Sequence, residues 1–259
     1  MTKWFFLLSA LSILTFACKK GTDSQEPENP SSARIKSMIY TDFTTGDTIG
    51  WFKYQYDAQG RVIELSIQTS PVGEAFVHKY EYYPQSVFDN ITVAQNTHWG
   101  RNIYTLDAAG FAVSELHVGY GMPGDSSILS TVVSKYDAEG YRIEVNTYLS
   151  GDTVTDKWKI VQGNRVSLDI WYTFGYADSL TETYSYFSNT ANTLGYVNQG
   201  MNFMGKSNVN LLKSSAISSP IPQSASYSYT FDSRNRVIAR KVRGSGIESN
   251  SCDLEVTYY

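Results

Sequence analysis

The sequence predicts an all-β protein: a single large antiparallel meander, strongly curled or partly closed into a barrel-like sheet built from hairpins with Asp-x-x-Gly turns. Three observations support this fold class. The chain has 20 Tyr, 12 Phe and 5 Trp among 259 residues, and aromatic residues favour the pleated surface of strands. Apolar and polar residues alternate along much of the chain, as half-buried strands require. One turn motif recurs along the sequence.

Composition and charge exclude two classes of protein. Apolar residues make up 42% of the chain, which is enough to build a core and excludes a wholly disordered protein. The 21 Lys and Arg residues stand against 25 Asp and Glu residues, for a net charge of -4. Because a nucleic-acid binder needs a basic stripe, we expect no nucleic-acid partner.

Residues 1–17 predict a signal peptide. After Lys3 the chain runs uncharged to Cys18, a stretch shorter than the roughly 20 apolar residues of a membrane-spanning helix. A small residue before Cys18 resembles a lipoprotein cleavage box, although Thr15 and Phe16 depart from its strict form. We therefore predict Cys18 as the lipidated residue. The alternatives are a soluble secreted protein cleaved elsewhere and an uncleaved anchor.

The lipid on Cys18 predicts an outer-membrane lipoprotein, on the periplasmic side or at the cell surface. Residues 18–34 are rich in Pro, Ser and acidic residues and predict a flexible tether. Residues 35–259 then form the all-β domain. Cys252 is left without a disulfide partner, and in its alternating stretch we expect it to be a small buried residue on a strand.

The alternation of period two assigns faces to the predicted strands. In residues 52–57 Phe and Tyr alternate with Lys, Gln and Asp, and residues 63–68, 141–146 and 226–231 behave alike. One set of side chains is then buried and the other faces water. About twelve to fifteen strands of ordinary length would account for these segments, and a sheet of that width must curl or split.

The recurring turn has the form Tyr-x-x-Asp-x-x-Gly or its close variants. The Asp carboxylate can accept hydrogen bonds from backbone N–H groups ahead of it, and Gly, or Asn as the next most tolerant residue, takes the left-handed conformation. We predict as structural turn residues Asp57, Gly60, Asp107, Gly110, Asp137, Gly140, Asp232 and Asn235. Compared with the motif at Asp57, the motif at Asp107 has one residue inserted before Val113. Residues 158–166 resemble a fifth, decayed copy of the motif.

The motif Tyr56-Asp57-x-x-Gly60-Arg61-Val62 resembles the YD repeats of large Rhs-type secreted shell proteins. Residues 35–259 as a whole resemble more closely a family of unknown function among Bacteroidota-type lipoproteins. Members of that family have a lipobox, a polar tether, several such hairpins and a Gly-Lys-Ser loop. The resemblance implies a porin-like, curled antiparallel sheet, and it implies no catalytic residue.

The segment Gly200–Ser207 satisfies the phosphate-binding pattern G-x-x-x-x-G-K-[ST]. Its Met201, Phe203 and Met204 are bulky where a backbone must approach phosphate, and the chain lacks the alternating strands and helices that hold such a loop. We expect no nucleotide partner. Instead we predict an irregular segment, residues 192–212, whose three bulky side chains plug an open end or face of the sheet.

No other motif in the sequence predicts chemistry. His78, His98 and His117 show no metal-ligand spacing, and we expect His117 at a strand surface. No Gly-x-Ser-x-Gly elbow of an exported hydrolase is present. We therefore expect no catalytic residue, no metal site and no cofactor.

The aromatic residues leave a sugar-binding alternative open. The side chains of Trp51, Trp99, Trp158 and Trp171, with many Tyr, could stack on sugar rings from one exposed face. Alternation assigns most Tyr to the apolar face, however, so we favour aromatics that fill the inner face and pair across strands.

We expect a non-enzymatic cell-envelope lipoprotein with a binding or scaffolding role, whose partner is a glycan or an envelope protein. One alternative is a glycan- or small-ligand-binding module that uses the aromatics of a curled sheet, and another is an unrecognised exported hydrolase. A membrane-spanning barrel is not favoured, because Leu254, Val256 and Tyr258 are out of phase with Tyr259.

The lipid anchor is testable by metabolic labelling with a palmitate analogue. We expect the wild-type chain to take up the label and the Cys18→Ala variant to lose it, because the thiol is the acylated group. Equal labelling of the two chains would contradict lipidation at Cys18.

Overall fold

The computed structural model describes residues 33–69, 73–93, 97–120, 126–173, 179–218, 222–245 and 251–259. The predicted signal peptide, Cys18 and the tether up to residue 32 lie outside the described residues.

The described residues form sixteen strands and one short 3-10 helix. These elements are β1 (Ile35–Asp42), β2 (Thr48–Tyr56), β3 (Val62–Gln68), β4 (Phe76–Tyr83), β5 (Ser86–Val93), β6 (Thr97–Leu106), β7 (Ala112–Tyr120), β8 (Ser126–Tyr136), β9 (Arg142–Leu149), β10 (Asp152–Val161), β11 (Asn164–Tyr172), β12 (Ser179–Ala191), η2 (Asn202–Met204), β13 (Asn210–Ser218), β14 (Gln223–Phe231), β15 (Val237–Ser245) and β16 (Cys252–Tyr258).

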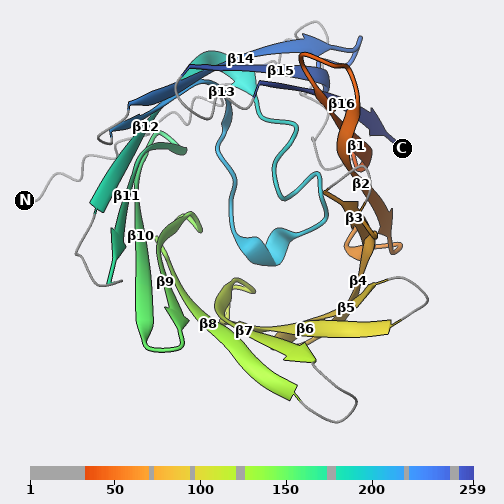
Figure 1. Ribbon diagram of the computed structural model, residues 1–259, viewed down its shortest axis with the longest axis vertical. Coiled ribbons are helices and arrows are strands. Elements are labelled where there is room, and N and C mark those ends of the chain that lie inside the picture. Colours follow the sequence, from red (N-terminus) through yellow and green to blue (C-terminus); the bar gives the residue numbers. More distant parts are fainter. Residues whose placement is uncertain are drawn as a thin grey trace, which may run out of the picture.

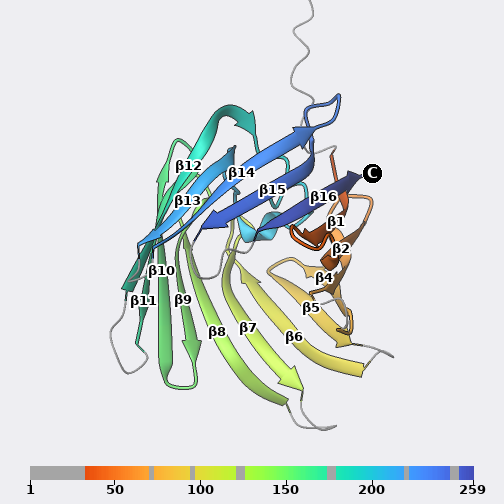
Figure 2. The same cartoon turned by 45° about the horizontal axis from the view of Figure 1, so that its top comes forward.

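The strands form a closed barrel (Figures 1 and 2). Each strand pairs antiparallel with its neighbours in sequence, and β16 returns to pair with β1. The predicted all-β antiparallel meander is therefore confirmed. The sequence left open whether the sheet closes, and closure is complete. The expected twelve to fifteen strands were too few, because the described residues alone supply sixteen.

The side chains that face the barrel interior form its core on the side of β1 to β7. One buried cluster joins β1, β2, β3 and β16, and a second joins β5, β6 and β7 to Phe203. Met38 and Tyr54 belong to the first cluster, and Val87 and Tyr104 to the second. The predicted filling of the inner face by strand aromatics is correct for these tyrosines.

The four Asp turns share one hydrogen-bonding pattern. At the first turn, Asp57 Oδ1 accepts the N–H of Gln59 at 3.0 Å and of Arg61 at 2.9 Å. The same two bonds recur at Asp107, Asp137 and Asp232. The backbone φ is +73° at Gly60 and +56° at Asn235, so both residues take the left-handed conformation that glycine and asparagine tolerate best.

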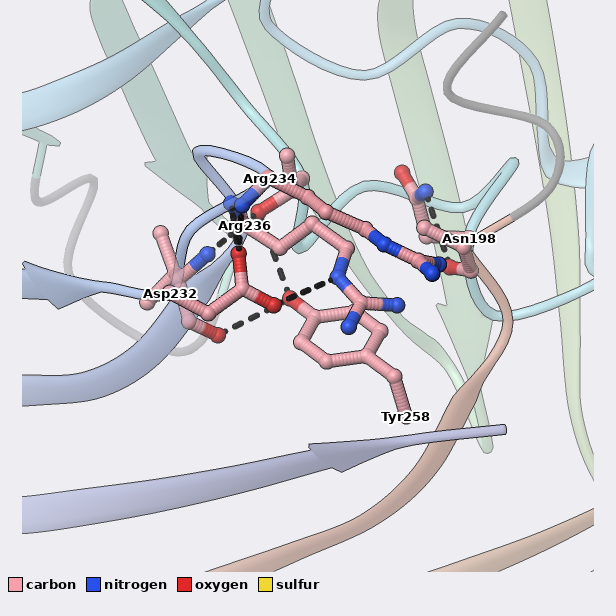
Figure 3. A network of polar contacts seen from close by, with 8 residues as sticks. Asn198, Asp232, Arg234, Arg236 and Tyr258 are labelled. Atoms are coloured by element: carbon pink, nitrogen blue, oxygen red, sulfur yellow. Dashed lines mark hydrogen bonds and ion pairs between the residues drawn. The ribbon is translucent and has the colours of Figure 1, made fainter. Parts of the chain in front are cut away.

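Figure 3 shows the last of these turns together with its neighbours on β16 and in the barrel interior. Arg236 donates through Nε to Asp232 Oδ2 at 2.7 Å, and its guanidinium carbon lies 4.5 Å from the ring centroid of Tyr258. Tyr258 in turn donates its hydroxyl to the carbonyl of Val237 at 2.9 Å. The turn is thereby fixed to the strand that closes the barrel.

A β-bulge follows each Asp turn, and the sequence pattern did not reveal it. The strand pairing skips the sixth residue after the Asp, which is Ile63, Val113, Ile143 or Ile238. The extra residue shifts the alternation by one position. The fifth residue after the Asp therefore faces the interior, where Val62, Ala112 and Val237 are buried.

The bulges correct two interpretations of the sequence. Ile63 does not share the buried face with Leu65, since it is 39% exposed while Leu65 is buried. The second copy of the turn has no insertion before Val113, because Ala112 takes the place that Val62 has in the first copy.

The decayed fifth copy is a hairpin of a different kind. The β10–β11 connection has positive φ at both Gln162 and Gly163, which is the two-residue turn that matches the twist of adjacent strands. The pairing after it skips Val166, so this hairpin keeps the bulge although it has lost the Asp.

Removal of one turn carboxylate tests its contribution to stability. We expect Asp137→Ala to lower the free energy of unfolding by about 1–2 kcal/mol, because the N–H groups of Glu139 and Tyr141 lose their acceptor. The control is Glu139→Ala, which removes the same charge from an exposed position of the same turn. Urea unfolding would measure both, and equal midpoints for the two variants would contradict the role of Asp137.

Candidate functional site

The chain between β12 and β13, residues 192–209, lies inside the barrel (Figure 1); we call it the plug. The ring of Phe203, which is 6% exposed, has its centroid 5.0 Å from that of Tyr104 and 6.2 Å from that of Tyr82. Met201 and Met204 pack against the same buried cluster. The prediction that these three side chains plug the sheet is confirmed.

Hydrogen bonds donated by backbone N–H groups fasten the plug to the hairpins at one end of the barrel. Four of these bonds involve the residues that follow or form the turns of β2–β3, β8–β9, β10–β11 and β14–β15. They join Val62 N to Gly200 O, Lys206 N to Gly140 O, Val209 N to Gly163 O and Val237 N to Thr193 Oγ1, at 2.8–3.2 Å. We call this end the plugged rim.

The resemblance of Gly200–Ser207 to a phosphate-binding loop has no matching structural context. The segment follows a series of turns and leads into strand β13. The Lys206 ammonium lies 5.5 Å from the ring centroid of Tyr141, and Ser207 Oγ accepts the N–H of Tyr196 at 2.7 Å. Both polar side chains of the motif are thus engaged in holding the plug.

The first described residues enter the barrel at the plugged rim. Asn198 in the plug donates to the carbonyl of Ala33 at 3.1 Å, and its own carbonyl accepts the N–H of Ile35 at 3.0 Å. Arg34 donates to the carbonyl of Val197. The plug therefore closes the end of the barrel at which β1 begins. The opposite end, where β7, β9 and β11 finish, is the open rim.

Acidic and histidine side chains gather on the inner wall formed by β4 to β7. The carboxylate of Asp89, which is 1% exposed, lies 2.9 Å from His78 Nδ1 and accepts a hydrogen bond from Asn102 at 2.9 Å. One strand further, His117 Nε2 lies 2.8 Å from Glu115 Oε1. The contact with Glu115 raises the pKa of His117, although burial opposes it.

The position of His117 corrects the expectation of a strand-surface residue. Asp89 pairs with Asn102, Asn102 pairs with His117, and His117 pairs with the buried Ser130. These side chains form one row across β5 to β8 on the inner face. The side chain of His98 lies outside the described residues.

Arginine side chains occupy the inner wall on the side of β9, β11 and β15. The guanidinium carbons of Arg142 and Arg165 lie 5.6 Å and 4.9 Å from the ring centroid of Trp158. Arg142, Arg165 and Arg240 each have one buried guanidinium nitrogen without a hydrogen-bond partner among the described residues. Burial lowers the pKa of Arg165, yet arginine keeps its charge at physiological pH.

Sequence reasoning missed the inner arginines because it carried a strict period of two through each hairpin. The bulges at Ile143 and Val166 turn Arg142 and Arg165 to the interior. A signal was nevertheless present. In the other Asp turns the fifth residue after the Asp is apolar, and at the same place the Asp137 turn has Arg142.

The tryptophan side chains do not share one face, as a sugar platform on the sheet would require. Trp158 lies on the inner wall between two arginines. Trp51 donates to Gln68 and Trp171 lies 5.3 Å from the Lys157 ammonium, both on the outer face. Trp99 is exposed near the open rim.

The outer face of the barrel is polar and charged. Glu144 on β9 lies between Lys135 of β8 at 2.7 Å and Lys157 of β10 at 3.8 Å. Arg243 pairs with Asp253 across β15 and β16 at 2.7 Å. Further polar cross-strand pairs link Gln55 with Glu64, Asn90 with Arg101, Thr181 with Asp169 and Ser185 with Ser214.

The described residues contain neither a membrane-spanning helix nor a cluster of metal ligands. None of the described helical segments is long and apolar enough to cross a membrane. Within the same ranges, no three His, Cys, Asp or Glu side chains are placed to hold a metal ion. Cys252 carries a free thiol and is half-buried rather than buried as expected.

A solved structure shares this fold. The crystal structure of a porin-like protein from Bacteroides uniformis superposes with a TM-score of 0.63 and 16% identity, over 87% of this chain and 98% of that chain. No protein-family model and no curated protein matches this sequence. The implied porin-like fold is confirmed, whereas kinship with the lipoprotein family and with YD repeats stays a prediction.

The plug is testable through its central aromatic residue. We expect Phe203→Ala to lower the free energy of unfolding by about 3–5 kcal/mol, because the variant leaves a cavity among Tyr80, Tyr82 and Tyr104. Val197→Ala, at a plug position that is 39% exposed, should change it by less than about 0.5 kcal/mol. If both variants kept the wild-type urea midpoint, the plug would not be part of the core.

Proposed function

We propose that this chain is a non-enzymatic lipoprotein of the cell envelope that binds a ligand inside its barrel. The porin-like barrel fold supports an envelope location. The lipid on Cys18 holds the barrel outside the bilayer, and the plugged rim faces the membrane because the tether enters there. The open rim faces away from the membrane and admits the ligand.

The observation that carries this proposal is the polarity of the barrel interior. Sixteen-stranded barrels are wide enough to leave an aqueous lumen. Here the lumen presents carboxylates and histidines on one wall and arginines on the other. Side chains of a filled apolar core would not need these charges, which cost free energy when they are buried.

The outer face supports a position outside the bilayer. A spanning barrel presents an apolar band to lipid, and a Lys or Arg at its middle costs about 2–4 kcal/mol. Lys157 lies in the middle of β10, and Lys79 lies in the middle of β4, both on the outer face. A lipid-tethered barrel surrounded by water meets no such cost.

A scaffolding role has a specific feature in its favour. Exposed large apolar side chains lie at both rims of the barrel, and one group of them is at the open rim, at the ends of the strands farthest from the plug. The members of this group are Phe43, Ile49, Trp99, Ile128, Leu129, Tyr148 and Trp171. Such residues suit contact with an envelope protein or stacking on a glycan that covers the mouth of the barrel.

An exported hydrolase is the second candidate, because acids and histidines converge on one wall. Glu115 with His117 forms a carboxylate–imidazole pair of the kind that general acid–base catalysis uses. Asp89, by contrast, is fully buried and its carboxylate is already bonded to His78 and Asn102. We favour binding over catalysis because the hydroxyl of Ser130, which lies beside His117 in the inner row, is buried.

A panel of glycoside, ester and peptide substrates tests the non-enzymatic proposal. We expect the purified wild-type chain to give no turnover above that of a buffer blank. Reproducible hydrolysis that His117→Asn abolishes, while the outer-face variant Lys157→Gln retains it, would overturn the proposal in favour of the hydrolase.

The position outside the bilayer is testable with the unlipidated Cys18→Ala chain. We expect it to stay monodisperse without detergent and to give no conductance in planar lipid bilayers, because its outer face is charged. Aggregation without detergent combined with discrete conductance steps would show a spanning barrel.

A further inference from the structure

We propose that the cavity between the plug and the wall of β11, β13, β14 and β15 binds a small oxyanion, a carboxylate or sulfate group, through Arg165 and Arg240. This inference rests on the proposed binding function and names the chemistry of the ligand. Arg165 extends from β11 and Arg240 from β15, and both line this one cavity together with Tyr229 and plug residues such as Asn192 and Gln199.

The size of the cavity fits a small ligand group. It encloses about 240 Å³, which is less than the roughly 300 Å³ at which pockets for drug-sized ligands begin. One sulfate, or the carboxylate end of an acidic sugar, fits this space with a few water molecules.

The arginines supply hydrogen-bond donors that no other described residue uses. Nη2 of Arg165 and Nε of Arg240 are buried and have no hydrogen-bond partner among the described residues. Neither side chain takes part in an ion pair with a described carboxylate. A buried charged donor left without an acceptor is costly, and a bound anion removes that cost.

The charges around Arg165 also favour an anion. The groups that act on it are the positive Arg142 and the hydroxyls of Tyr196, Tyr186 and Tyr184. Arg240 contacts Tyr40 and lies beside Tyr229. Burial raises the pKa of Tyr229 to about 12 although Arg240 lowers it, so this phenol is neutral and the cavity keeps a positive charge.

Several polar groups that line the cavity are already bonded. Asn192 Oδ1 accepts the N–H of Leu194, and Asn208 Oδ1 accepts the N–H of Arg165. The hydroxyl of Tyr229 donates to the carbonyl of Leu212. The buried guanidinium nitrogens of Arg165 and Arg240 remain as donors, and the fork geometry of guanidinium matches an oxyanion better than a neutral sugar or a cation.

Isothermal titration calorimetry of the purified lipidated protein in detergent tests the proposal. The probes are sodium sulfate, sodium glucuronate and neutral glucose, each at constant ionic strength. We expect both anions to bind and glucose to give no heat. Tighter binding of glucuronate than of sulfate identifies an acidic glycan as the source of the anion, and the reverse order identifies a free inorganic anion.

Two variants and one matched control locate the site. We expect Arg165→Gln and Arg240→Gln to weaken anion binding at least about tenfold, because each removes charge-assisted hydrogen bonds. Arg243→Gln removes an arginine from the same strand as Arg240, but on the outer face where it pairs with Asp253. We expect this control to bind as tightly as the wild-type chain.

Thermal unfolding separates lost binding from lost folding. We expect anion to raise the melting temperature of the wild-type and Arg243→Gln chains and to leave that of Arg165→Gln and Arg240→Gln unchanged. Without anion, the two inner variants should melt no lower than the wild-type chain, since each loses an unpaired buried charge.

The outcomes distinguish this inference from the function on which it rests. Anion binding that survives both inner substitutions would overturn the Arg165–Arg240 site. Binding of neutral glycans on an array, with no response to either anion, would overturn the oxyanion and leave the binding function standing. Absence of binding to anions and to the array together would overturn both.

Discussion

Pairing between the first and last strands is the interaction on which the rest of the molecule depends. In the β1–β16 ladder, Met38 stands opposite Val256 and Tyr40 opposite Leu254, so the seam is both hydrogen-bonded and apolar on its inner side. An open sheet of this width would expose two unpaired edges. Closure removes both edges and encloses a lumen. The plug and the inward-facing charged side chains lie in this lumen.

Local features of the fold were predictable, because they depend on residues close in sequence. The Asp turns need one carboxylate and one residue tolerant of positive φ within four positions, and alternation needs only nearest neighbours. Closure could not be derived in this way, since β1 and β16 are joined by contacts between opposite ends of the domain. The count of strands failed for a related reason: a strand such as β13, with two adjacent Leu and two adjacent Ser residues, lacks the alternation that would mark it.

The candidate site was hidden by single residues that break the period of two. A bulge at Ile143 leaves one residue unpaired and places Arg142 on the opposite face from the one that strict alternation predicts. Arg142 and Arg165 thereby move from the expected outer face to the lumen. The plug was easier to predict, because Met201, Phe203 and Met204 are bulky apolar residues in a segment without strand alternation, and such residues must be buried somewhere.

The plugged rim also brings the two ends of the domain together. The N–H of Tyr259 donates to the carbonyl of Arg34 at 3.1 Å, so a short peptide linker could join them without disturbing a strand. Every strand pairs with its sequence neighbours, and β16 pairs with β1. The same set of strand pairs would therefore form if the chain began and ended at a different turn. A circularly permuted gene that opens instead at the exposed β9–β10 turn, around Gly151, would encode the same barrel.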